Sequence, residues 1–179
     1  MPIKSLTIYC SSSNKLSPEY YNLADNIGKF LAKKSITIIY GGGKVGIMGK
    51  VSNSAYNSGG KVIGIIPKFL STKEKINRKI SKIIIVKNMS ERKRLLFEMG
   101  EALLILPGGS GTIEEATEII SWKLLKIHNK KIILFNFKKF WDPLIQMYNE
   151  AKTKKFGNKN LQTICKNVDS LQDFKKIFS

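Results

Sequence analysis

The chain has 179 residues, of which 42% are hydrophobic, and its formal net charge is +18. This length is typical of one domain with a substantial core, and no apolar run approaches the roughly 20 residues that cross a membrane. The positive charge favours anionic small molecules as ligands. Because the lysines are spread along the chain, without a basic arm or a nucleic-acid module, we expect no specific nucleic-acid binding.

The cysteines and the N-terminal sequence bear on the compartment. Cys10 and Cys165 lack the spacing of metal ligands, and with His128 as the single histidine they predict no metal site. The first residues lead directly into an apolar run without a signal-peptide pattern. We therefore expect a cytoplasmic protein with reduced thiols. His128 follows a predicted helix, and we interpret it as structural, with a partly charged ring.

Apolar runs alternate with segments of helical periodicity along the chain. Strands are predicted at residues 3–10, 35–40, 61–66, 83–87, 102–106 and 131–136, with a short strand at 164–168. Helices are predicted to begin at Pro18 behind the N-cap Ser17, after Gly46, behind the N-cap Ser90, and at Asp142. Further helices are predicted at 111–127 and 170–178, and loops at 68–82, with a short helix, and at 152–160.

This order of elements predicts the fold class. Strands that are apolar on both faces and alternate with helices form a mostly parallel sheet covered by helices on both sides. We expect six or seven strands in a Rossmann-like three-layer α/β sandwich, with residues 1–179 as a single nucleotide-binding domain. In such sheets ligands bind at the carboxyl ends of the strands. Two glycine-rich loops lie at such ends, so we expect both to face one cleft.

The loop after the fifth predicted strand has the features of a phosphate site. Its glycines allow the backbone to approach a ligand closely, and the following helix start offers free N–H groups and partial positive charge. Thr112 adds a hydroxyl donor. The expected phosphate-binding residues are Gly108, Gly109, Ser110, Gly111 and Thr112.

The loop after the second predicted strand, Gly41–Gly46, matches the dinucleotide pattern GxGxxG. That pattern also needs an acidic residue at the end of the next strand, and Ile66-Pro67 ends it here. The Walker pattern is absent as well, because Val51 follows Lys50 where Ser or Thr is required. We expect Gly42 and Gly43 to contact a nucleotide without hydride- or phosphoryl-transfer chemistry.

Charged residues beside the phosphate loop indicate a reaction. A carboxylate at Glu115 repels a bound phosphate, so its presence needs a reason, and catalysis at the sugar carbon is our leading one. Glu118 lies on the same helix face, and paired carboxylates suit hydrolysis of a glycosidic bond. Glu114 is a favourable acid at a helix start. Arg92 and Lys93 lie in the first turn of another helix, where cations are unfavourable unless an anion faces them.

Together these motifs resemble the Lonely Guy family of cytokinin riboside 5′-monophosphate phosphoribohydrolases, which are often mislabelled lysine decarboxylases. Pro107–Glu115 has the form PGGxGTxxE, and Met89-x-x-Arg92-Lys93 precedes it. The resemblance covers nearly the whole chain, with further matches at Tyr9-Cys10 and Ser12-Ser13, Tyr40–Gly43, Val45–Gly49, Ile66–Leu70 and Trp141–Leu144. It departs from the family at Ser11, where Gly is usual, and at Ser90, where His is usual.

The resemblance implies hydrolysis of an N6-modified AMP to free base and ribose 5-phosphate, by a homodimer without a metal or redox cofactor. By matching position, it implies Arg92 and Glu115 as the catalytic pair and Glu74, Lys93, the run Gly109–Glu115 and Ser121 as substrate contacts. Two alternatives stay open: a broader nucleosidase that acts on AMP or other nucleoside 5′-monophosphates, and a nucleotide-binding protein without turnover. Lysine decarboxylation has no support, because no lysine lies in a suitable pyridoxal-phosphate frame.

Overall fold

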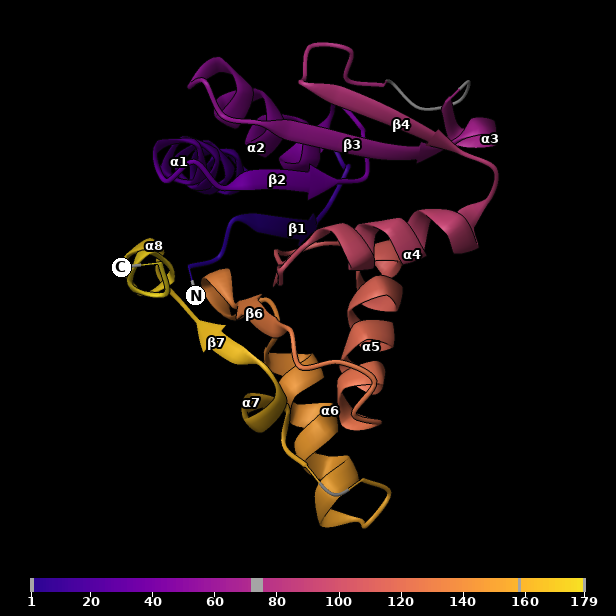
Figure 1. The fold of residues 1–179 in the computed structure, drawn as a ribbon. Helices are drawn as coiled ribbons and strands as arrows, with labels where there is room; N and C mark the ends of the chain where they lie inside the picture. Colours follow the sequence, from indigo (N-terminus) through magenta and orange to yellow (C-terminus); the bar gives the residue numbers. More distant parts are fainter. Residues whose placement is uncertain (1, 72–75, 158, 179) are drawn as a thin grey trace.

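The computed structural model describes residues 2–71, 76–157 and 159–178. Within them, seven strands form one sheet in the order β4-β3-β2-β1-β5-β6-β7, and every pairing is parallel (Figure 1). The predicted Rossmann-like fold and strand number are confirmed. The strands are β1 Ser5–Tyr9, β2 Thr37–Tyr40, β3 Val62–Pro67, β4 Lys82–Val86, β5 Ala102–Ile105, β6 Lys131–Phe135 and β7 Lys166–Val168.

Helices cover both faces of the sheet, as the three-layer prediction requires (Figure 1). One core cluster joins α1, α2 and α8 to the sheet, and a second joins α4, α5, α6 and α7 to its other face. The helices are α1 Pro18–Lys33, α2 Gly46–Asn57, α3 Lys68–Ser71, α4 Met89–Met99, α5 Ser110–Leu124, α6 Asp142–Thr153, α7 Leu161–Ile164 and α8 Leu171–Lys176, with the short 3₁₀ helix η1 Phe137–Lys139.

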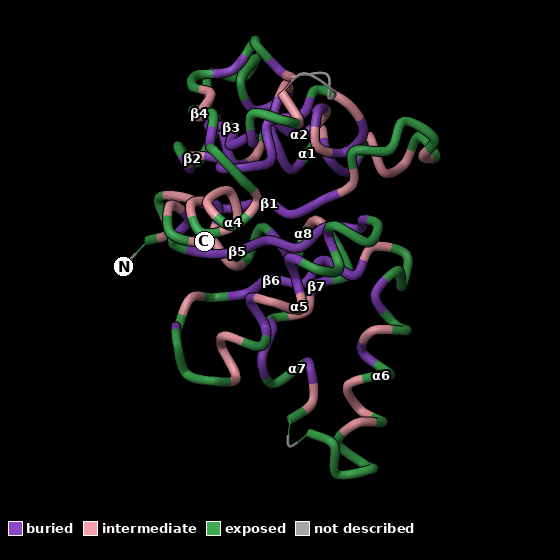
Figure 2. The backbone as a smooth tube through the Cα atoms, turned by 90° about the vertical axis from the view of Figure 1, so that its right-hand side faces the viewer, coloured by how far each residue is buried: buried purple, intermediate pink, exposed green. Residues whose placement is uncertain are grey.

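The central strands are apolar throughout because both of their faces are covered. In β5, Leu103 and Leu104 are both fully buried, yet they belong to the two different core clusters. Successive side chains of a strand point to opposite faces, so each must find an apolar layer of its own. Figure 2 shows the result as continuous burial along the middle of the sheet.

The start of α4 differs from the prediction of Ser90 as its N-cap. The N-cap is Asn88, whose side-chain oxygen accepts a hydrogen bond from the Glu91 backbone N–H at 2.9 Å. Glu91 in turn accepts one from the Lys87 N–H at 2.8 Å, which satisfies a second backbone donor. Asn88 rather than Ser90 is thus the N-cap, and Ser90 lies within the first turn of the helix.

Other helix boundaries also differ from the prediction. Helix α5 ends at Leu124 rather than at residue 127, because Lys126 adopts a left-handed φ of 61° that turns the chain away. Helix α6 extends to Thr153, and α7 precedes the last strand, which therefore begins only at Lys166. The predicted short helix within 68–82 is present as α3, and Ser170 caps α8 as its position suggested.

The order of strands brings the candidate loops together. Moving outward from the centre, the chain runs β1 to β4 on one side and β5 to β7 on the other, so β1 and β5 form the topological switch point. Tyr9 is in register with Ile105, and Ile8 with Tyr40, so the loops after β1, β2 and β5 leave the same edge. No helix of the described residues has the length and apolar character that crossing a membrane requires.

Candidate active site

A cavity of about 390 Å³ opens at this switch point. The loop after β1 forms one wall, the start of α5 another, and the first turns of α2 and α4 complete it. The residues that line the cavity are Cys10, Ser11, Ser12, Ser13, Met48, Met89, Arg92, Gly109, Ser110, Gly111, Thr112, Glu114 and Glu115. The volume lies at the small end of the range of ligand pockets.

The start of α5 offers unoccupied backbone donors to this cavity. The helical hydrogen bonds begin with Ile113, whose N–H donates to the Gly109 carbonyl at 3.0 Å, and no side chain caps the helix. The N–H groups of residues 110–112 precede that bond and therefore lack helical partners. A Cβ atom at Gly109 or Gly111 would meet nothing within 4 Å, so the glycines leave open space in front of these donors. This arrangement suits a phosphate.

Gly108 serves this helix start differently from its neighbours. It does not line the cavity, and a Cβ atom there would lie 2.2 Å from the Thr112 hydroxyl oxygen. The glycine therefore allows the loop to pack closely against the first turn of α5. Thr112 is buried and lines the cavity, and its role as a hydroxyl donor stays a prediction.

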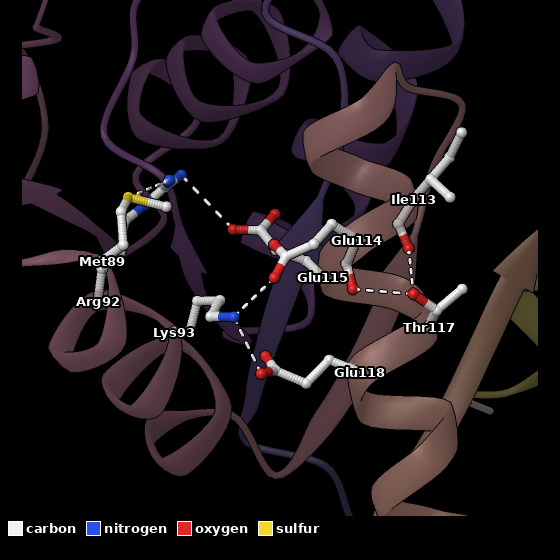
Figure 3. A network of polar contacts seen from close by, with 8 residues as sticks. All are labelled: Met89, Arg92, Lys93, Ile113, Glu114, Glu115, Thr117 and Glu118. Atoms are coloured by element: carbon white, nitrogen blue, oxygen red, sulfur yellow. Dashed lines mark hydrogen bonds and ion pairs between the residues drawn. The ribbon is translucent and has the colours of Figure 1, made fainter.

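Arg92 of α4 and Glu115 of α5 face each other across the cavity (Figure 3). The Arg92 Nη2 atom lies 3.7 Å from Glu115 Oε1, which is an ion pair but too long for a hydrogen bond. Both side chains are nearly buried, and neither Arg92 Nε nor Glu115 Oε1 has a hydrogen-bond partner within the described chain. Buried polar groups are normally satisfied, so this pair is poised to accept further partners in the cavity.

The environment of Glu115 disfavours its charge. Burial raises the pKa of the Glu115 carboxyl to about 7, and the Arg92 guanidinium opposes this shift only in part. Glu114 and Glu118 raise the pKa further by repulsion, while Lys93 lowers it. A carboxyl that titrates near neutral pH in a cavity is characteristic of functional sites, because structural carboxylates are normally ionised and fully hydrogen-bonded.

Lys93 joins the two helices beside this pair. Its ammonium donates to Glu114 at 2.6 Å and to Glu118 at 2.9 Å (Figure 3), and these hydrogen bonds raise the pKa of Lys93. Glu118 is thus held by Lys93 and is not among the residues that line the cavity, so of the two carboxylates paired on this helix face only Glu115 lines it, and Glu118 stays a predicted substrate contact. Lys93 thus bridges α4 to Glu114 and Glu118 of α5, next to the ion pair of Arg92 with Glu115.

Three further predicted substrate contacts lie elsewhere. Gly42 and Gly43 are buried behind the cavity wall: the Gly42 carbonyl accepts from the Asn77 N–H, and Gly43 forms a β-bridge with Ile76. Ser121 is exposed on α5, beyond the residues that line the cavity. Glu74 lies outside the described residues.

Three residues that line the cavity, Cys10, Met48 and Met89, lie in the sequence motifs but were not predicted to contact the substrate. Cys10, at the end of β1, is buried, and burial raises the pKa of its thiol, so the thiol stays protonated. Met48 and Met89 contribute thioether side chains to the wall. The position of Cys10 in the sequence could have indicated this, since residues directly after a central parallel strand line the cleft of such folds.

His128 is structural, but its predicted partial charge is wrong. Its Nε2 atom lies 2.9 Å from the Ile119 carbonyl oxygen, and its Nδ1 atom accepts from the Lys130 N–H at 3.1 Å. One nitrogen donates and the other accepts, which is the pattern of a neutral ring. Burial lowers the pKa of His128 in agreement with this.

Comparison with known proteins places these features in a family. The family model described as "Possible lysine decarboxylase" matches residues 48–177. The chain is also 34% identical over 170 residues to the cytokinin riboside 5′-monophosphate phosphoribohydrolase of Rhodococcoides fascians, covering 93% of this chain and 86% of that protein. The chain belongs to the Lonely Guy family.

Solved structures agree on the fold of this Lonely Guy family member. The crystal structure of TM1055 matches with a TM-score of 0.74 at 22% identity, covering 97% of both chains. The molybdenum cofactor binding protein of Rippkaea orientalis matches with a TM-score of 0.71 at 18% identity, covering 100% of this chain and 99% of that one. These likenesses extend to the fold alone.

The two departures from the Lonely Guy pattern fall in different places. Ser11 lies in the cavity wall, where its hydroxyl accepts from the Ser13 N–H at 3.0 Å and its own N–H donates to the Pro107 carbonyl at 3.2 Å. Ser11 thereby ties the loop after β1 to the loop after β5. Ser90 is exposed on the first turn of α4 and does not line the cavity.

Proposed function

We propose that this protein hydrolyses the N-glycosidic bond of an adenosine 5′-monophosphate that carries a cytokinin-type N6 group. The products are the free base and ribose 5-phosphate. The observation that carries the proposal is the buried Glu115 carboxylate, whose Oε1 atom has no hydrogen-bond partner among the described residues and which faces the same cavity as a helix start suited to phosphate. The names of the relatives at 34% identity support this substrate class.

In the proposed complex the 5′-phosphate accepts hydrogen bonds from the N–H groups of residues 110–112 and from the Thr112 hydroxyl. This places the ribose over Glu115, which lies one helical turn deeper in the cavity. The partial positive charge at the helix start and the net charge of +18 both favour a nucleotide with a dianionic phosphate over an uncharged nucleoside.

The ionised Glu115 then stabilises positive charge as the bond between the sugar carbon and the base nitrogen breaks. It also orients the attacking water, whose oxygen bonds to that sugar carbon while its proton is transferred, overall, to the departing base. Arg92 favours the ionised form of Glu115 and lies within reach of the sugar hydroxyls. Arg92 and Glu115 are therefore the proposed catalytic residues.

A panel of nucleoside 5′-monophosphates, with free base measured chromatographically, tests the proposal. We expect the variants Glu115→Gln and Arg92→Ala to lose on the order of 10²- to 10⁴-fold in rate. Arg94→Ala is the matched control, since Arg94 is exposed on the same helix and pairs only with Glu98 among the described residues. Normal turnover by Glu115→Gln would refute the assignment.

The same panel separates the alternatives. Equal turnover of AMP and N6-isopentenyl-AMP would indicate a broader nucleosidase. Tight binding of these nucleotides without any release of base would indicate a nucleotide-binding protein. We favour hydrolysis over simple binding because a phosphate binder gains nothing from a buried carboxylate in its cavity.

We further propose that the chain is one domain, functions in the cytoplasm and forms a homodimer. Large apolar side chains are exposed at the end of α5, where Leu125 is 71% and Ile127 is 62% accessible. A second copy that covers them would remove this apolar surface from water. Sedimentation analysis should find a dimer for the native chain and a monomer for Leu125→Asp/Ile127→Asp, and a native monomer would refute the dimer.

A further inference from the structure

Hydrogen bonds do little to hold the Arg92 guanidinium in place. Nη2 is 3.7 Å from Glu115, Nη1 is 3.8 Å from the Met89 sulfur, and Nε has no partner within the described chain. A guanidinium normally fixes its orientation through several short, directional hydrogen bonds. The position of Arg92 must therefore depend largely on the shape of the wall against which it packs.

That wall contains Gly41, the first residue after β2. A Cβ atom at Gly41 would lie 2.4 Å from Arg92 Nη2 and 3.2 Å from the terminal methyl group of Met48. The guanidinium thus occupies the space that any side chain at this position would fill. The φ angle of Gly41 is outside the left-handed region, so its backbone does not itself require glycine.

The last glycine of the same loop supports the opposite wall. Gly46 has a φ of 65°, and a Cβ atom there would lie within 2.8 Å of backbone atoms of Ser11, Ser12 and Ser13. The Gly46 N–H also donates to the Asn14 side chain at 3.2 Å. This loop therefore supports two walls of the cavity from behind, whereas the start of α5 faces the cavity itself.

We propose that the Gly41–Gly46 loop positions the reacting groups rather than binding the phosphate, and that the missing side chain at Gly41 seats the Arg92 guanidinium beside Glu115. Gly41 is thus a positioning residue that acts through Arg92. The inference rests on the proposed function for its kinetic consequences, but the contact between Gly41 and Arg92 is independent of it.

Displacement of Arg92 has an electrostatic consequence at Glu115. The groups that influence this carboxyl are, on α4, Arg92 and Lys93, and on α5, Glu114 and Glu118. Tyr9 of β1 and Cys10, the residue after it, also interact with this carboxyl, and both are uncharged near neutral pH because burial raises the pKa of both side chains. Of the two cations, Arg92 lowers the Glu115 pKa more, so moving it away raises that pKa above about 7.

The test compares Gly41→Ala, Arg92→Ala and the double variant with Gly60→Ala as the control. A Cβ atom at Gly60 meets the Ala32 methyl group at 2.8 Å and the Ala55 carbonyl oxygen at 2.9 Å, so this variant is also overpacked, against less flexible neighbours, but it lies beside α1 and α2 and away from Arg92. We expect Gly41→Ala to lower kcat about 10- to 100-fold with little change in KM. In the Arg92→Ala background, Gly41→Ala should have no further effect on kcat or Tm.

A carboxyl titration by ¹³C NMR tests the same inference without turnover. We expect the Glu115 pKa to rise in Gly41→Ala and to stay unchanged in Gly60→Ala. If the native protein hydrolyses no nucleotide but this pKa shift occurs, the proposed function fails and the positioning role stands. A native Glu115 pKa in Gly41→Ala, or an equal loss of kcat or of folding in both Arg92 backgrounds, would overturn the positioning role.

Discussion

Glu115 carries a free-energy cost for which the proposed function gives a reason. Burial raises its pKa from 4.5 to about 7, so above neutral pH the folded protein carries a charge that the interior disfavours. Folding alone would favour an uncharged side chain at this position. The carboxylate is useful only when positive charge develops on a ligand in the cavity, which is the condition that glycosidic bond cleavage provides.

The raised pKa of Glu115 predicts how the stability of the protein depends on pH. Because the pKa of Glu115 is raised on folding, its stabilising contribution is complete below about pH 4.5 and is lost as pH rises through about 7. Relative to native protein, Glu115→Gln should therefore gain on the order of 3 kcal/mol in unfolding free energy between pH 4.5 and pH 8. Urea denaturation at both pH values measures this difference, and Glu150→Gln, an exposed glutamate on α6, is the control.

The same pKa predicts the pH dependence of the reaction. Only ionised Glu115 stabilises positive charge on the sugar, so kcat/KM, which reports the free protein, should rise with pH and level off above an apparent pKa near 7. An initial-rate profile from pH 5 to 9 at nucleotide concentrations well below KM tests this expectation. A rate that falls across the interval from pH 5 to 7 would mean that Glu115 acts in its protonated form.

Side-chain contacts join helices α4 and α5 beside the candidate site. Lys93 bridges them near the cavity, and the Phe97 ring of α4 packs edge-on against Trp122 of α5 further along. Lys130, in the loop after α5, holds the end of α4. The Lys130 ammonium donates to the carbonyls of Phe97, Glu98 and Gly100 at the end of α4, and it lies 4.2 Å from the centre of the Phe97 ring. A cation there satisfies carbonyls that lack helical partners and complements the helix dipole.

We therefore expect Lys130→Met to weaken the protein by about 1–3 kcal/mol, since it leaves these carbonyls without a donor. Lys131→Met removes an exposed lysine from the neighbouring position and should change stability by less than about 0.5 kcal/mol. Urea midpoints measure both variants. Equal stability of the two would mean that water replaces the Lys130 ammonium at little cost.

The whole molecule carries a net charge of +18, and its proposed substrate is an anion. Long-range attraction accelerates encounter but does not alter the bond-breaking step, so salt should lower kcat/KM and leave kcat unchanged. Rates measured between about 50 and 500 mM salt test this expectation, because the Debye length falls from roughly 14 Å to roughly 4 Å over this range. A kcat that falls in parallel would instead indicate that salt disturbs the site itself.

Local signals were sufficient for much of the fold. Continuous apolar runs such as β5 predict buried parallel strands because each strand face must meet an apolar layer. Boundaries were harder where a residue acted outside its usual role, as when Lys126 adopted a left-handed conformation that favours glycine. The α4 start was misplaced because Asn88 and Ser90 are both suitable caps, and only the backbone of the following turn distinguishes them.

The candidate site was also only partly predictable from the sequence. Arg92, Glu115 and the helix start at Gly109–Thr112 could be selected from sequence because their chemistry is unfavourable unless they share a site. The contacts between side chains could not be predicted from the sequence. Glu118 is held by Lys93, and the Gly41 loop lies behind Arg92. Residue type and spacing determined the sheet, the phosphate loop and the charged pair, since these follow from local periodicity and chemistry. Only the packing of α4 against α5 and β2 decided which charges meet, because side chains distant in sequence are brought together by the tertiary fold.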